Sequence, residues 1–62
     1  MITDKEKYLM ALKSNNGLLD EITLGKTIGF TEDKTNQLID ELVTEGKIEF
    51  QSFGLCSYRS RQ

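Results

Sequence analysis

Carboxylates are the side chains best placed to do chemistry in this 62-residue chain, and several occur as adjacent pairs. The pairs are Asp20-Glu21, Glu32-Asp33 and Asp40-Glu41. Two carboxylates share acid–base work or a divalent cation only if they converge, whereas neighbours in a helix point about 100° apart. Glu41 and Glu45 do share one helix face, which we interpret as a mildly repulsive surface pair. These carboxylates therefore do not predict a catalytic or metal site.

Cysteine and histidine chemistry is equally sparse. Cys56 is the only cysteine, which excludes an intramolecular disulfide and a cysteine-based zinc site. The chain has no histidine, the commonest general base and transition-metal ligand, and no glycine-rich phosphate loop. We expect Cys56 to be a small buried hydrophobe. The sequence predicts that the protein is not an enzyme and needs no cofactor.

Length and composition indicate one small folded domain, residues 1–62. A chain of this size buries only about 60% of the surface that its unfolded form exposes. Its composition, 37% apolar and 29% charged, is that of a soluble globular protein. No apolar run approaches the roughly 20 residues of a membrane span, and the N-terminal MITDKEKYLM is unlike a signal peptide. We therefore expect a cytoplasmic protein without membrane contacts.

The first expected helix begins at a capping box, Thr3-x-x-Glu6. The Thr3 hydroxyl can accept from the backbone N–H of Glu6, and Glu6 can reach back to the N–H of Thr3. The helix should run to about Ser14, with Tyr8, Leu9 and Leu12 buried, and end at Asn15-Asn16-Gly17. Leu18-Leu19 could then form one brief strand.

A second helix of about eight residues should follow, with Asp20 as its N-cap. Gly25 lies inside it and costs about 1 kcal/mol relative to alanine. It is either a tolerated glycine or the point where a neighbouring helix crosses too closely for a side chain. We favour the close crossing.

The third expected helix, residues 31–46, is capped by Thr31 and ends at Gly46. Thr31, Thr35, Leu38 and Leu42 fall on one line of this helix, flanked by Ile39. The opposite face consists of Asp33, Asn36, Gln37, Asp40 and Thr44. Five acids and one base give this segment a net charge of −4.

After Gly46 the hydrophobic period changes from 3.6 to 2, which predicts a β-hairpin over residues 47–60. With Ser52-Phe53-Gly54 as its loop, Ile48 would pair with Tyr58 and Lys47 would lie opposite Arg59. The same register pairs Phe50 with Cys56 and Gln51 with Leu55. The expected fold is mainly α with a small β-hairpin (α+β), in the order helix, short strand, helix, helix, two-stranded hairpin.

This order resembles the winged helix-turn-helix domains of bacterial transcription regulators. The resemblance covers nearly the whole chain and is carried by Leu24, Gly25, Ile28, Gly29-Phe30-Thr31, Thr35, Leu38, Leu42, Gly46 and Ile48. It implies that the third helix enters the major groove of DNA and that the hairpin is the wing. Asp40 and Glu41 depart from the family pattern, because those positions are often basic in it.

The positions that match the groove-contacting residues of the family are Asp33, Lys34, Asn36 and Gln37. Asparagine and glutamine can bond an adenine edge in two places, and lysine can reach guanine. Lys47 and Arg59 would meet phosphates, with Arg61 extending the contact. Three or four such contacts give weak, salt-sensitive binding to double-stranded DNA. The alternative is that Asn36 and Gln37 are ordinary solvated surface.

A second hypothesis is a winged-helix module that binds proteins and not DNA. Its acidic third helix would suit a basic partner. In the expected register Phe53 and Leu55 lie off the apolar face at the hairpin tip. They could contact a protein partner, a second copy of the chain or the DNA minor groove, unless one of them folds back over the core.

Overall fold

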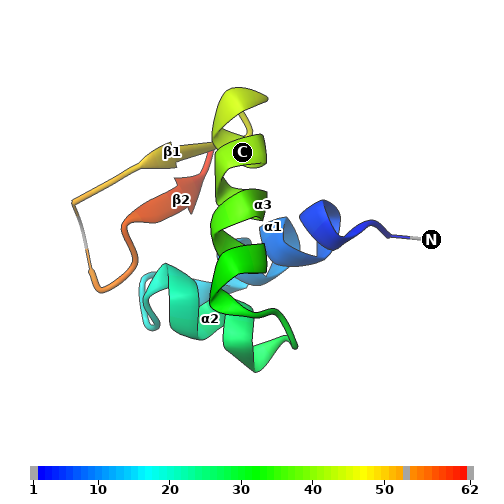
Figure 1. The fold of residues 1–62 in the computed structure, drawn as a ribbon. Coiled ribbons are helices and arrows are strands. Elements are labelled where there is room, and N and C mark those ends of the chain that lie inside the picture. The colour runs from blue at the N-terminus through cyan, green and yellow to red at the C-terminus, as the bar shows by residue number, and fades with distance from the viewer. Residues whose placement is uncertain (1, 53, 62) are drawn as a thin grey trace.

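The computed structural model describes residues 2–52 and 54–61 and contains three helices followed by a two-stranded antiparallel hairpin (Figure 1). The helices are α1 (Asp4–Asn15), α2 (Glu21–Thr27) and α3 (Glu32–Thr44). The strands are β1 (Ile48–Phe50) and β2 (Tyr58–Ser60). This confirms a mainly α fold with a small hairpin. No helix in the described part of the chain combines the length and apolar character needed to cross a membrane.

Helix α1 begins and ends where the sequence predicts. The Thr3 hydroxyl accepts from the Glu6 N–H at 3.1 Å, but the Glu6 carboxylate accepts from that same hydroxyl at 3.3 Å. The expected return bond to the Thr3 N–H is therefore replaced by a side-chain bond. Asn16 is in the left-handed conformation, with φ of 51°, and closes the helix.

The brief strand expected at Leu18-Leu19 is wrong, because no described residue between α1 and α2 is in a strand. The side chain of buried Asn15 donates to Leu19 O at 2.8 Å and accepts from Leu19 N at 2.9 Å. It thus takes both backbone groups that a strand would pair. The loop has one backbone bond to the hairpin region, from Leu55 N to Gly17 O at 3.0 Å.

The close crossing expected at Gly25 is confirmed, and it joins α2 to α3. A β-carbon on Gly25 would lie 2.0 Å from Thr35 Oγ1 and 2.8 Å from Thr35 Cγ2, far inside van der Waals contact. Thr35 is fully buried, and its hydroxyl donates to Thr31 O at 2.8 Å. The two helices can therefore approach only because residue 25 has no side chain.

The hairpin exists, but the expected register is wrong by two residues. Ile48 pairs with Ser60, Glu49 with Arg59 and Phe50 with Tyr58. The three-residue loop is also wrong, because Gln51 N still donates to Ser57 O at 2.8 Å, and the connection lies between these residues. Within it, the α-carbon of Gly17 lies 3.3 Å from where Gly54 would carry a β-carbon. This contact with the α1–α2 loop accompanies the wider turn.

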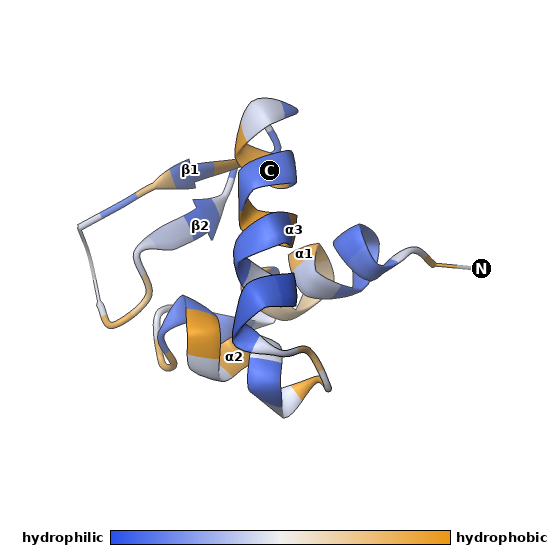
Figure 2. Cartoon of the chain, viewed as in Figure 1, coloured by the Kyte–Doolittle hydropathy of each residue, from blue (hydrophilic) through white to orange (hydrophobic). Residues whose placement is uncertain are grey.

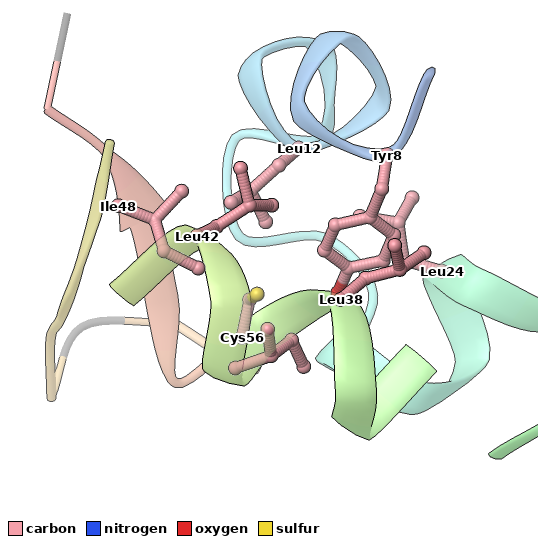
Figure 3. Packing of buried hydrophobic residues seen from close by; sticks show 8 residues of the cluster. Tyr8, Leu12, Leu24, Leu38, Leu42, Ile48 and Cys56 are labelled. Atoms are coloured by element: carbon pink, nitrogen blue, oxygen red, sulfur yellow. The ribbon is translucent and has the colours of Figure 1, made fainter. Parts of the chain in front are cut away.

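The core is a single cluster that receives side chains from every helix and from the hairpin region (Figure 3). Tyr8 and Leu12 of α1 face Leu24 of α2 and Leu38 and Leu42 of α3. Ile39, Ile48 and Cys56 complete the cluster. The Tyr8 hydroxyl donates to Glu21 O at 2.9 Å, so the largest buried side chain has its polar atom satisfied.

Phe50 lies outside the core. It is 70% exposed, although its neighbour in alternation, Ile48, is 2% exposed. The two-residue shift keeps the two faces of each strand unchanged, because side chains alternate with a period of two. The outer part of the hairpin extends beyond the helices that cover Ile48. Phe50 contacts Tyr58 there, in an edge-to-face arrangement with the two ring centroids 6.2 Å apart.

Candidate nucleic-acid interface

The outward face of α3 contains the two amides that the sequence singles out. Asn36 and Gln37 are both exposed, as are Asp33, Asp40 and Thr44, so the helical periodicity assigned this face correctly. Gln37 Nε2 donates to Glu41 Oε2 at 3.2 Å. The side chain of Asn36 bonds to no other described residue. Figure 2 shows α3 coloured mainly as hydrophilic beside the hairpin.

Lys34 lies on a different edge of α3, and its cation is engaged. Its Nζ is 3.5 Å from Asp4 Oδ2, in the first turn of α1. Asp4 is 30 positions away in the sequence. A contact from Lys34 to a base would therefore require this ion pair to open, which is inexpensive for a surface pair.

The basic residues at the base of the hairpin are arranged differently from the expectation. Arg61 N donates to Lys47 O at 3.0 Å, so Arg61 and not Arg59 is the neighbour of Lys47 across the hairpin. Lys47 Nζ lies 3.6 Å from Glu45 Oε1. Arg59 lies opposite Glu49, and its Nε and Nη2 are both 2.9 Å from Glu49 Oε1.

Arg61 differs from the other cations of this region. Its guanidinium makes no ion pair with any described residue, and its Nη1 would lie 3.7 Å from a β-carbon on Gly46. It is therefore located at the C-terminal end of α3, next to the start of the hairpin. Of the four basic residues named from the sequence, Arg61 has the most freely available charge.

The acids of α3 divide into a paired and an unpaired group. Lys5 of α1 forms ion pairs with Glu41 and Glu45, the pair to Glu41 at 3.5 Å. The hydrogen bond from Lys5 holds the pKa of Glu45 below its usual value, and the same bond raises the pKa of Lys5. Glu32, Asp33 and Asp40 are exposed and form no ion pair within the described residues.

The hairpin turn presents apolar surface, as the sequence suggests. Leu55 is 71% exposed, and Phe53 lies outside the described residues. Two further exposed apolar side chains were not anticipated, Phe50 at 70% and Leu18 at 73%. The alternation of apolar residues could not reveal the exposure of Phe50, because the alternation continues along β1 beyond the point where the helices cover the strand.

Cys56 lies in the core and not in a reactive setting. Its side chain is 2% exposed, and the thiol donates to Tyr58 O at 3.2 Å. Burial raises the pKa of the Cys56 thiol, which disfavours the nucleophilic thiolate. Within residues 2–52 and 54–61, no group of three or more histidine, cysteine, aspartate or glutamate side chains could hold a metal ion.

Comparison with protein-family models, with curated proteins and with solved structures found no match to this chain.

Proposed function

We propose that this protein binds double-stranded DNA as a small regulator of the winged-helix type, with α3 at the major groove and the hairpin base on the phosphates. The observation that carries the proposal is the pair of exposed amides Asn36 and Gln37 on the outward face of α3. Asn36 has no competing partner among the described side chains. Both residue types can bond the edge of adenine through two atoms.

The backbone contacts would come from the residues at the hairpin base. Lys47 and Arg61 are neighbours there, and Arg61 has no acidic partner in the described chain. Arg59 would have to exchange Glu49 for a phosphate. Asp33 and Asp40 flank the amides and repel phosphates, so the expected affinity is low and depends on salt.

The experiment is an amide chemical-shift titration of isotope-labelled protein with a mixed-sequence duplex, at low salt and again near physiological salt. DNA docking predicts salt-sensitive shifts at Asn36, Gln37, Lys47 and Arg61. Non-specific binding is strongest at low salt. A silent titration under that condition would refute the proposal.

Alanine variants test the assigned roles. Lys47→Ala and Arg61→Ala should each weaken binding on all sequences and reduce the slope of log K against log salt by about 1. Lys13→Ala is the matched control, because it removes an exposed cation at the end of α1. Asn36→Ala should instead change sequence preference. If Lys13→Ala lowers the slope as much as Lys47→Ala, the hairpin base is not the phosphate contact.

The second candidate function is a protein-interaction module that binds a basic partner. It is favoured by the unpaired acids Glu32, Asp33 and Asp40 on the exposed side of α3, and by the pairing of Lys34 with Asp4. A silent DNA titration, together with shifts at Asp33 and Asp40 on adding an arginine-rich peptide, would favour this function. Asp40→Asn should then reduce peptide binding.

A further inference from the structure

The most exposed apolar side chains of the described chain belong to the α1–α2 loop and to the hairpin region. They are Leu18 at 73%, Leu55 at 71% and Phe50 at 70%. The bond from Leu55 N to Gly17 O holds the segment of Leu55 beside the loop of Leu18. Figure 2 shows apolar colour at the free end of the hairpin and in the loop before α2. We call Leu18 and Leu55 the leucine pair.

The leucine pair lies in the part of the chain that has no charge. The chain has 18 acidic and basic residues, 10 and 8, yet segments 14–19 and 50–58 contain none of them. Exposed leucines on a small protein are ordinary when scattered, whereas exposed apolar side chains on segments that lie side by side can form a contact site.

We infer that the leucine pair is the contact between two copies of this chain. The net charge is −2, and α3 exposes Glu32, Asp33 and Asp40, so contact between two α3 faces is repulsive. Contact through the leucine pairs avoids a direct contact between two α3 faces. In the two-fold arrangement that we infer, Leu18 of each copy lies against Leu55 of the other, so that both copies use the same patch.

The size of the patch predicts a weak dimer. A standard interface takes about 800 Å² from each partner. That is about one fifth of the 4141 Å² surface of this chain, and a patch centred on two leucines is smaller. Association should therefore depend on concentration, and salt should not weaken it because screening reduces the repulsion between like-charged copies.

The test is sedimentation velocity without DNA, from about 10 μM to about 1 mM, a range that spans weak association. The mean mass should rise from 7.1 kDa towards twice that value. Leu18→Ser and Leu55→Ser should abolish the rise, and circular dichroism should show an unchanged fold because both side chains are exposed. Met10→Ser, which changes a 55% exposed residue of α1, is the control and should leave the rise intact.

A charge-swap pair tests the symmetric contact itself. Leu18→Lys and Leu55→Glu should each be monomeric alone. An equimolar mixture should associate, because the ammonium introduced by Leu18→Lys in one copy then faces the carboxylate introduced by Leu55→Glu in the other, while the second Leu18–Leu55 contact remains. A monomeric wild type at the highest concentration overturns the inference. So does association that survives Leu18→Ser, or a mixture that stays monomeric.

Discussion

Gly25 and Thr35 meet where α2 crosses α3, and their contact leaves no room for a methyl group. The Thr35 hydroxyl is oriented by its bond to Thr31 O, and its side chain is fully buried. Thr35 therefore cannot rotate away without losing a hydrogen bond or displacing a core neighbour. A polar residue in the core of this protein thus serves to fill the space opposite a glycine.

Gly25→Ala should destabilise the protein by about 2 kcal/mol, although alanine is the better helix former, because overpacking costs about 1–3 kcal/mol. The measurement is the free energy of unfolding in urea. Thr35→Ala alone should also destabilise, since it removes buried atoms. The double variant should be more stable than the sum of the two single effects predicts. Simple additivity would show that the two residues do not compete for space.

At the scale of elements, the hairpin is attached to the helices by two backbone contacts from the segment that precedes β2. Ser57 N donates to Glu21 Oε1 at 3.2 Å, and Leu55 N donates to Gly17 O. Glu21 is also the first residue of α2, where its charge is favourable to the helix dipole. It therefore has two roles that substitution must separate.

Glu32 is the matched comparison, because it is the first residue of α3 and its side chain bonds to no described residue. Glu21→Ala should lower the free energy of unfolding by about 1.5 kcal/mol more than Glu32→Ala does, because a hydrogen bond to a carboxylate contributes about that much. The Ser57 amide shift should move only in the Glu21 variant. Equal losses of stability would mean that the hairpin is not anchored through Glu21.

The elements themselves could be predicted, since their signals are local. Thr3, Asp20 and Thr31 each cap a helix as expected, and period-two alternation located the hairpin. The register could not be predicted, because Gly54 packs against Gly17, a residue far away in the sequence. The same limit applies to the site. Periodicity found the exposure of Asn36 and Gln37, but the partners of Lys34 and Lys47 depend on how the helices pack.

At the scale of the whole molecule, one cluster of ion pairs joins the first turn of α1 to the C-terminal end of α3. Lys5 of α1 reaches Glu41 and Glu45 at the C-terminal end of α3, and Lys47 adds a second cation at Glu45. Exposed pairs of this kind contribute little individually. Their effect is seen most clearly in how stability depends on pH.

The stability of the protein should fall in acid. The pKa of Glu45 is lowered by its bond from Lys5, and that of Asp20 by its bond from Thr23. Their contributions are present above the ordinary values of 4.5 and 3.8 and are lost as pH falls through the lower folded values. The raised pKa of Lys5 acts oppositely: its contribution is present below 10.5 and lost as pH rises beyond the folded value.

Lys5→Met tests this linkage. Without Lys5, the pKa of Glu45 returns towards its ordinary value, so the fall in stability between about pH 5 and about pH 2 should become shallower. Urea unfolding midpoints across that range measure it. Lys13→Met, which removes an exposed cation elsewhere on α1, should leave the acid slope unchanged. An identical slope in wild type and Lys5→Met would contradict the linkage.

The position of Cys56 and β2 in the chain has a consequence for synthesis. Cys56 is part of the core, and Ile48 is covered only when residues up to Ser60 have paired with it. When only α1, α2 and α3 of the growing chain have emerged from the ribosome, these residues are still missing. The chain must therefore wait with Ile48 uncovered, in a state that is vulnerable to aggregation and to proteases. The finished fold can be reached only after residue 60 has left the ribosome.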